Sequence, residues 1–248
     1  MLVSAFLLGI VGLILGSFIA TVVLRWPEGR SVMRGRSACD GCGRTLQPRE
    51  LVPLLSAALQ RGRCRTCGAP IAALHWQVEL AAGLIGVVAG AVAPGGEGVA
   101  GAMFGWLLLT LAVLDLRAWW LPDVLTGTLG AGGLLVGLVG VEPALIDRAV
   151  GGVAGFALLW LIAVAYRRLR GREGMGGGDP KLFGAIGLWL GWAMLPAVLL
   201  VASLIGLGVM LFRQLTGRAM AATDALPLGA LLAAAAYPTW LLMVALRP

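Results

Sequence analysis

The stretch Gly174-Met175-Gly176-Gly177-Gly178-Asp179-Pro180-Lys181-Leu182 leads from a glycine-rich connector into an apolar run that extends to Leu200. Asp179 is therefore expected where the chain enters a membrane. An ionisable residue at such a position is costly unless it is paired or used, so it is a candidate functional residue. A second carboxylate, Asp115, ends another apolar run. Two carboxylates in similar positions indicate acid/base chemistry at a membrane surface.

The composition excludes an ordinary soluble domain. Of the 248 residues, 59% are hydrophobic and only 12% are charged, and the mean hydropathy is +0.93. These values predict an all-α polytopic integral membrane protein. A net charge of +7 would suggest nucleic acid as a partner of a soluble protein. In a membrane protein the placement of the charges matters more, and the expected partner is the lipid bilayer, with no nucleic acid.

The apolar runs predict about eight transmembrane helices, since ~20 apolar residues cross the hydrocarbon core. The first run has no basic start and no clear small-residue cleavage site, which favours a span over a signal peptide. The expected spans are Leu2–Leu24, His75–Ala93, Val99–Asp115, Pro122–Val141, Ala149–Ala165, Pro180–Leu195, Pro196–Phe212 and Ala225–Leu246.

The basic residues predict the orientation of these spans, because Lys and Arg concentrate in cytoplasmic loops. Only Arg148 and Arg247 fall on one side of the predicted membrane. The other side is therefore expected to be cytoplasmic, with both termini outside and both Asp115 and Asp179 at the cytoplasmic boundary. The residues on that side are Arg25, Arg30, Arg34, Arg36, Arg44, Arg49, Arg61, Arg63, Arg65, Arg117, Arg167, Arg168, Arg170, Arg172, Lys181, Arg213 and Arg218.

One polar segment interrupts the membrane spans. We expect a first transmembrane helix over residues 1–24, a small cytoplasmic segment over 25–74 and a membrane-embedded core over 75–248. The segment contains two Cys-x-x-Cys pairs, Cys39/Cys42 and Cys64/Cys67. Four thiolates from two such turns can surround a tetrahedral zinc ion. The reducing cytoplasm disfavours disulfides.

A redox pair or buried cysteines without a metal are the competing interpretations of this segment. An all-cysteine shell leaves no open coordination position, so the predicted zinc is structural rather than catalytic. A segment this polar could hardly build a core of its own, and metal binding would supply folding energy.

The two carboxylates can act as a catalytic pair if the fold brings them together. Two adjacent carboxyls do not both ionise easily, so they share a proton. The ionised member can take a proton from water while the neutral member polarises a carbonyl, as in aspartic proteases. Structural interpretations remain open for each residue alone. Asp115 could pair with Arg117 or Arg172, and Asp179 could cap a helix that Pro180 starts.

Four other ionisable residues are weaker candidates. Asp123 lies in the first turn of its span, where an acid suits the helix dipole. Glu79 lies inside the second span and needs a partner, so it is a supporting residue or a substrate contact. His75, the only histidine, borders the cysteine segment and is more consistent with an interfacial position than with catalysis. Lys181, the only lysine, could meet an acid of a substrate helix.

The order and spacing of these motifs resemble the prepilin peptidases of bacterial type IV pilus and type II secretion systems. The resemblance covers almost the whole chain and includes the Gly-x-Gly-Asp motif shared with presenilin-like membrane proteases. The residues that support it are Gly16-Ser17-Phe18, Arg25-Trp26-Pro27, Glu50-Leu51-Val52-Pro53-Leu54-Leu55-Ser56, Arg61-Gly62-Arg63-Cys64-Arg65-Thr66-Cys67-Gly68, Asp115 with Leu121-Pro122-Asp123, and Gly176-Gly177-Gly178-Asp179-Pro180-Lys181-Leu182.

The resemblance implies an aspartic endopeptidase of the bacterial inner membrane. It would cut a basic leader from a prepilin or pseudopilin substrate helix at the cytoplasmic face, with Asp115 and Asp179 as the catalytic pair and Cys39, Cys42, Cys64 and Cys67 as metal ligands. Many members also methylate the new N-terminal amine with S-adenosylmethionine. The family often has Asn where this chain has Ala20, a departure that bears on methyl transfer but not on cleavage.

Two other classes of function fit parts of the sequence. A proton-coupled transporter could use the same acids, but it predicts paired broken helices and carboxylates near the middle of the membrane. A zinc-knuckle membrane adaptor without enzymatic activity would explain the cysteines and leave the two carboxylates unexplained.

Overall fold

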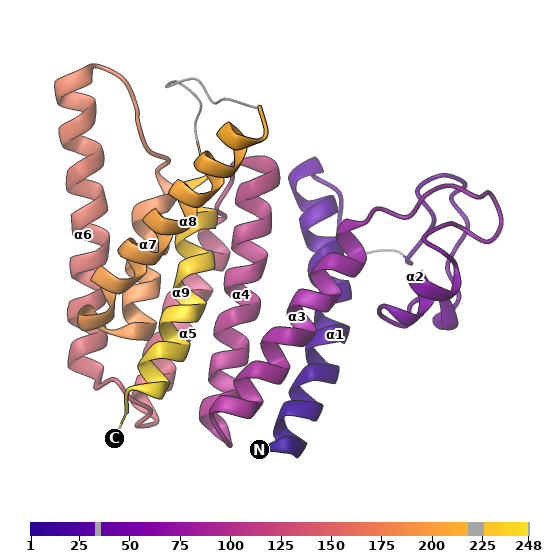
Figure 1. The fold of residues 1–248 in the computed structure, drawn as a ribbon, viewed down its shortest axis with the longest axis horizontal. Coiled ribbons are helices and arrows are strands. Elements are labelled where there is room, and N and C mark those ends of the chain that lie inside the picture. The colour runs from indigo at the N-terminus through magenta and orange to yellow at the C-terminus, as the bar shows by residue number, and fades with distance from the viewer. Residues whose placement is uncertain (33–35, 218–225, 248) are drawn as a thin grey trace. The chain divides into compact units, whose positions relative to one another are not determined.

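A computed structural model of the chain describes residues 1–32, 36–217 and 226–247. Arg34 and Arg218, and Ala225 at the predicted start of the last span, lie outside the described residues. Helices make up the regular structure of the described part, where the extended pairing is limited to two isolated bridges. The prediction of an all-α protein is confirmed (Figure 1).

Eight helices follow the eight predicted spans in order. They are α1 (Leu2–Arg25), α3 (Leu74–Val92), α4 (Gly96–Ala118), α5 (Asp123–Leu138), α6 (Leu145–Arg170), α7 (Gly178–Leu190), α8 (Leu195–Leu215) and α9 (Leu228–Ala245). Shorter pieces are α2 (Leu55–Leu59) and the 3₁₀ turns η1 (Trp26–Glu28), η2 (Pro48–Glu50) and η3 (Trp192–Met194). Among the described residues, six of the helices are long and apolar enough to cross a membrane.

The two remaining helices, α5 and α7, are shorter than a bilayer is thick. They have 16 and 13 residues, or ~24 and ~20 Å at 1.5 Å per residue, against a hydrocarbon core of ~30 Å. Helix α7 ends where Gly191 adopts a φ of +73°. Gly191 and the 3₁₀ turn η3 separate α7 from α8. The sixth predicted span therefore ends five residues earlier in the structure, at Leu190, whereas α8 begins at Leu195, one residue before the predicted start of the seventh span.

The chain divides into two compact units, residues 1–110 and 111–248, and α4 passes from one to the other. In the first unit, α1 and α3 pack along much of their length. Glycines permit their close approach, because a Cβ atom on Gly86 would lie 2.1 Å from the Leu8 carbonyl oxygen, and one on Gly12 would lie 2.2 Å from that of Ala82. Small residues at such crossings are typical of membrane helices.

Helix α7 is the core of the second unit. Its apolar side chains Leu182, Phe183 and Ile186 are fully buried, and it packs against α5, α6 and α9. The contact with α6 is close, since a Cβ atom on Gly187 would lie 2.2 Å from the Gly151 carbonyl oxygen. A helix that is apolar on all sides is either enclosed by other helices or spans a membrane, and α7 is enclosed.

Arg148, near the start of α6, holds one end of this unit together. It is 1% exposed, and its guanidinium donates to six backbone carbonyl groups rather than to an acid. These acceptors are Gly133, Val141, Glu142, Pro143, Leu188 and Trp189. The last two belong to the final turn of α7, so Arg148 lies at the opposite end of α7 from Asp179.

Candidate active site

Asp115 lies in the last turn of α4 and is 5% exposed. Its Oδ2 atom accepts a 2.8 Å hydrogen bond from the backbone N–H of Ala230, in the first turn of α9. The backbone of Gly229 also approaches closely, since a Cβ atom there would lie 2.9 Å from the same oxygen. Among the described residues, no ion pair joins Asp115 to Arg117 or Arg172, so the partners of this carboxylate are backbone amides.

Asp179 is the second residue of α7 and is 7% exposed. The helix begins at Gly178 with Gly177 as its N-cap, and no side chain caps it. The Asp179 carboxylate therefore does not act as the helix cap. Its Oδ2 instead accepts a 3.1 Å hydrogen bond from the N–H of Gly176 in the preceding connector.

The two carboxyl groups lie close enough to interact electrostatically. Each also lies next to the backbone N–H of Gly229. The site is thus assembled from the end of α4 and the beginnings of α7 and α9. The first N–H groups of a helix lack intrahelical partners and carry the positive end of the helix dipole, so the start of α9 is a suitable neighbour for negative charge.

Gly229 and Ala230 are parts of this site that were not predicted from the sequence. The signal was the run Pro227-Leu228-Gly229 at the start of the last apolar stretch. Proline just before a helix marks its first turn, and glycine permits close approach by another group. These residues do not reveal which group approaches, because the partner lies 115 positions away in the sequence.

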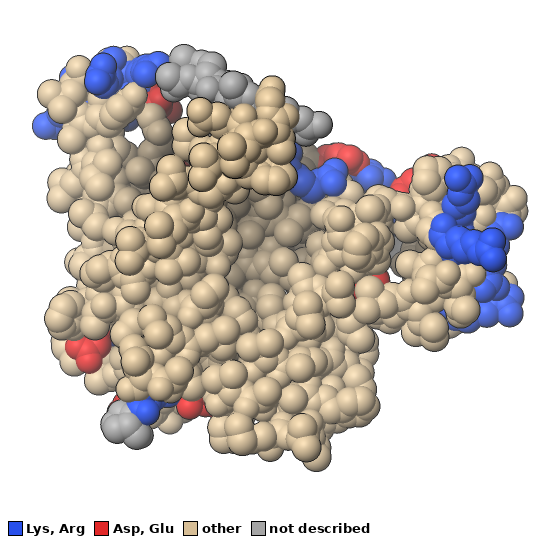
Figure 2. Space-filling model, viewed as in Figure 1, with Lys and Arg blue, Asp and Glu red and all other residues tan. Residues whose placement is uncertain are grey.

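The carboxylate pair lies at the arginine-rich end of the second unit. Arg167, Arg168 and Arg170 occupy the last turn of α6, and the connector to α7 folds back on α6, with Gly174 against the Tyr166 ring. Figure 2 shows the basic cluster at this end. Arg148 and Arg247 lie at the other end, where both donate to the Glu142 carbonyl oxygen.

The weaker candidates have other partners. Lys181 Nζ lies 2.7 Å from Asp123 Oδ1 in an exposed ion pair. Glu79 is 6% exposed and accepts a 2.9 Å hydrogen bond from the Leu54 N–H, which supplies the partner that its burial requires. Leu54 has a φ of +59°, a conformation uncommon for leucine.

The four cysteines form one cluster in the first unit. Their sulfur atoms all lie within 4.8 Å of one another, a geometry that can hold a metal ion. Each pair is turned in the same way. The N–H of Gly43 donates to the Cys39 carbonyl and that of Gly68 to the Cys64 carbonyl, and both glycines adopt a positive φ, of +68° and +72°.

The donor set fits zinc. Tetrahedral Zn–S bonds of ~2.3 Å imply sulfur atoms roughly 3.8 Å apart, and the Cys39 and Cys67 sulfurs are 3.7 Å apart. The backbone N–H groups of Cys67 and Thr66 lower the pKa of the Cys64 thiol to about 6, whereas burial and the neighbouring sulfur atoms raise the pKa of Cys67 to about 11. At Cys64 the shift favours the thiolate that a metal requires. The predicted clustering of the four cysteines is confirmed.

An ion pair supports the first cysteine turn. Arg44 and Glu50 form a bidentate pair with distances of 3.0 and 2.7 Å, and Glu50 also accepts a hydrogen bond from the Gln47 N–H. The Arg44 side chain, followed by that amide, lowers the pKa of Glu50 to about 2. The Arg44 carbonyl in turn accepts from the Cys39 N–H, so this pair orients the backbone of a metal ligand.

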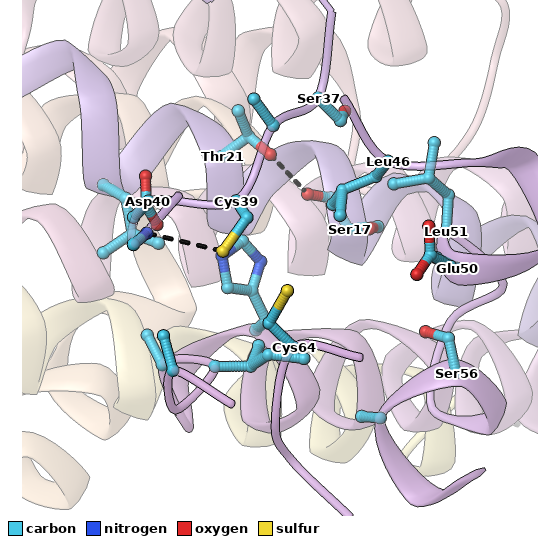
Figure 3. Close-up of a pocket in the computed structure, with 18 of the residues that line it drawn as sticks. Ser17, Thr21, Ser37, Cys39, Asp40, Leu46, Glu50, Leu51, Ser56 and Cys64 are labelled. Atoms are coloured by element: carbon cyan, nitrogen blue, oxygen red, sulfur yellow. Dashed lines mark hydrogen bonds between the residues drawn. The ribbon is translucent and has the colours of Figure 1, made fainter. Parts of the chain in front are cut away.

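A cavity of about 210 Å³ lies beside the cysteine cluster, between α1, α3 and residues 37–72. In Figure 3, Cys39 and Cys64 point into it together with Ser17, Thr21 and Glu50. His75 and Glu79 also line it. The cavity therefore combines hydroxyl and carboxylate groups with the metal-ligating turns.

Comparison with known proteins places these features in a family context. Residues 10–92 match the bacterial peptidase A24 N-terminal domain, and residues 102–211 match the type IV leader peptidase family. Curated relatives named prepilin leader peptidase/N-methyltransferase include proteins of Aeromonas hydrophila, 44% identical over 74% of this chain, and Burkholderia pseudomallei, 39% identical over 93%. No solved structure matches the chain significantly.

The extent of these matches differs between relatives. The aligned part spans 65% of the Aeromonas hydrophila protein, 82% of the Burkholderia pseudomallei protein and, at 39% identity, 81% of a relative from Dickeya chrysanthemi. The four cysteines lie within the first matched range and both carboxylates within the second.

Proposed function

The chain belongs to the type IV leader peptidase family, and on this premise we propose that it is a membrane aspartic endopeptidase that removes the basic leader from type IV prepilins or type II secretion pseudopilins. The observation that supports this most is the pair of buried carboxyls, Asp115 and Asp179, which interact electrostatically at the ends of two membrane helices. Burying two acids side by side is unfavourable, which favours a chemical role over a purely structural one.

In the proposed mechanism the pair shares one proton. The ionised carboxylate accepts a proton from a water molecule, whose oxygen attacks the carbonyl carbon of the scissile bond. The neutral carboxyl donates a hydrogen bond to the carbonyl oxygen. As the tetrahedral intermediate collapses, the C–N bond breaks and the leaving amine takes a proton from the pair. The amides of Gly229 and Ala230 hold Asp115 in position throughout.

We propose that the active site faces the cytoplasm from the inner membrane, with both termini on the opposite side. This orientation is supported by the position of the carboxylate pair, which lies at the arginine-rich end of the second unit. Arg167, Arg168 and Arg170 mark that end, and Lys and Arg concentrate on the cytoplasmic side of membrane proteins.

We propose that the cysteine cluster, within residues 25–74, holds a structural zinc ion. Four thiolates fill a tetrahedral shell, so the metal would supply folding energy to a segment with little apolar core. The core over residues 75–248 would then perform the cleavage.

Methylation of the new N-terminal amine is a second proposed activity, supported by the name of the relatives. S-adenosylmethionine would supply the methyl group. The cavity beside the cysteines offers carboxylates for its cationic sulfur, but its volume of about 210 Å³ is below the ~300 Å³ at which ligand pockets usually begin. The cavity is therefore too small for the whole S-adenosylmethionine molecule, and no residue is assigned to binding of the methyl donor.

Processing of a prepilin by purified variants tests the proposed peptidase. Asp115→Asn and Asp179→Asn are each expected to slow cleavage by about 10²-fold or more, the range of general acid–base catalysis. Asp147→Asn is the matched control, since Asp147 lies in the first turn of α6 and accepts from the Trp192 indole. Cleavage at the normal rate by either active-site variant would exclude the mechanism.

A further inference from the structure

A groove of about 540 Å³ runs along the second unit where α5, α6 and α7 meet. On α5 its lining residues recur every three or four positions from Asp123 to Leu134, so they form one face of the helix. That face is ~16 Å long at 1.5 Å per residue, about three turns. The other lining residues are Gly152 and Phe156 on α6, and Lys181, Gly184, Ala185 and Leu188 on α7.

Gly127 lines the middle of the groove, and packing inside the protein does not explain why this residue is a glycine. A Cβ atom on Gly127 would meet no atom within 4 Å. By contrast, a Cβ atom on Gly133 of the same helix would lie 2.6 Å from the Leu188 carbonyl oxygen. Packing inside the unit therefore explains Gly133 but leaves Gly127 facing open space, next to the exposed Ala131.

One end of the groove is charged and lies at the first turn of α7, the helix that also carries Asp179. Lys181 and Asp123 form their 2.7 Å ion pair there, and Lys181 follows Asp179 by two residues. Both side chains are exposed. An ammonium group has three N–H donors, and Asp123 accepts from one of them. Lys181 can therefore donate to a further oxygen at this end of the groove.

The position of the active site limits the form of its substrate. The carboxylates lie at the ends of membrane helices. A substrate chain whose scissile peptide bond reaches them must continue, on one side of that bond, into a segment that can lie in hydrocarbon. In that environment a single chain must satisfy its own backbone polar groups, so the segment is a helix. Helices approach one another closely in membranes where one surface has small residues, as the groove has at Gly127, Gly130 and Ala131.

We propose that this groove binds the apolar helix of the prepilin and that Lys181 binds a carboxylate or carbonyl oxygen near the cleaved end of that helix. The inference rests on the proposed peptidase function and adds the surface that positions its substrate. The ion pair fixes the direction in which a helix docks, because the groove is charged only at the end where α5 and α7 begin.

Substitution of Gly127 tests the groove in the full-length protein reconstituted in nanodiscs. A Cβ atom at position 127 meets no atom within 4 Å, so Gly127→Leu places its side chain in the groove. It also replaces glycine by a better helix former, so the fold should be retained. We expect kcat/KM for a prepilin that contains its apolar helix to fall about tenfold, mainly through KM. Gly127→Ala should have a smaller effect, and Val124→Leu, on an exposed part of α5 outside the groove, should have none.

A leader peptide that ends shortly after the cleavage site distinguishes groove binding from damage to the active site. Gly127→Leu should cleave this peptide at the wild-type rate. If Gly127→Leu cleaves the full prepilin at the wild-type rate, the groove proposal is wrong, although the peptidase proposal stands. If the wild type cleaves neither substrate, the proposed function itself fails.

Photo-crosslinking provides a second measurement that does not depend on turnover. A benzophenone amino acid at Ala131, which lines the groove, should form adducts with the prepilin in the Asp179→Asn background. The same probe at Leu135, exposed on α5 but outside the groove, should not. Adducts with lipid alone at position 131 would show that an acyl chain occupies the groove and would overturn the proposal.

Discussion

The backbone N–H of Ala230 donates a 2.8 Å hydrogen bond to the Oδ2 atom of Asp115. This contact joins the first turn of α9 to the last turn of α4 and places the amide of Gly229 beside both carboxyls. The start of α9 therefore belongs to the candidate active site together with the two acids. Its main-chain groups are positioned by the helix itself, so they require no side-chain ordering when a substrate binds.

Gly229→Ala is expected to impair cleavage strongly. The added Cβ atom would lie 2.9 Å from Asp115 Oδ2 and 2.7 Å from Leu121 Cδ1, so the Asp115 carboxylate must shift. A displacement of ~1 Å in a catalytic group can cost about 10²-fold in rate. Prepilin processing by the purified variant, compared with its thermal unfolding in detergent, measures the effect.

Gly208→Ala is the matched control for this prediction. Gly208 lies in α8, and a Cβ atom there would meet nothing within 4 Å. A Gly229→Ala enzyme that is as active as the control would show that the approach of α9 to Asp115 is not needed for catalysis.

The helices were predictable from the sequence because apolar runs of suitable length determine where a chain can cross a membrane. The contacts between helices were not. A charge at the start of an apolar run identifies Asp179 as a candidate from the sequence, whereas Gly229 looks like an ordinary helix glycine until Asp115 is found next to it. Hydropathy also does not indicate that α7 is enclosed by its neighbours, which explains how a 13-residue helix replaces a full-length span.

Arg148 illustrates the same limit. In the sequence it is one of two basic residues on the predicted outer side, and charge counting assigns it no structural role. In the structure it is 1% exposed and bonded to backbone carbonyl groups of α5, α7 and the turn before α6. Backbone acceptors leave no mark in a sequence, so this set of hydrogen bonds could not be foreseen.

The protein is expected to retain one zinc ion per chain through its four cysteines. Cys64→Ser replaces the only buried cysteine of the cluster and should abolish stoichiometric zinc in metal analysis. Residues 36–74 should then become susceptible to limited proteolysis, because the metal supplies their folding energy. Ser37→Ala, in the same segment, is the control. Full zinc content in Cys64→Ser would contradict the site.

Thiol titration separates the zinc hypothesis from a redox pair. The zinc-bound protein should react slowly with a thiol reagent, and addition of a chelator should expose four reactive thiols. Fewer than four thiols after chelation without a reductant would indicate a disulfide, which the metal interpretation does not allow.

The stability of the first cysteine turn should depend on pH through Glu50. Its pKa is lowered to about 2 by Arg44 and the Gln47 amide, so the carboxylate stabilises the folded segment above its ordinary pKa of 4.5. This contribution is lost as the pH falls from about 4.5 towards 2. Hydrogen exchange of the amides of residues 39–50, compared between wild type and Glu50→Gln, should show a difference at pH 6 that disappears near pH 2.

At low pH, protons also compete with the metal for the cysteine sulfurs. Wild type and Glu50→Gln have the same cysteines, so comparing the two at each pH removes this effect. Glu28→Gln serves as a control, because Glu28 pairs with Arg30 at an exposed position where an ion pair contributes little. A difference between wild type and Glu50→Gln that persists unchanged at pH 2 would show that the carboxylate charge is not its source.

Arg148→Lys is expected to destabilise the second unit although it keeps the charge. The guanidinium satisfies six carbonyl groups, whereas an ammonium has three donors in a compact group. Each buried carbonyl left without a donor costs ~1–3 kcal/mol, so thermal unfolding in detergent should begin at a clearly lower temperature. Arg247→Lys, at a more exposed position beside Glu142, is the control.

Because Arg148 lies at the opposite end of α7 from Asp179, the folded Arg148→Lys variant should retain its KM for prepilin at low temperature. A changed KM with normal stability would mean that Arg148 acts on the substrate rather than on the fold.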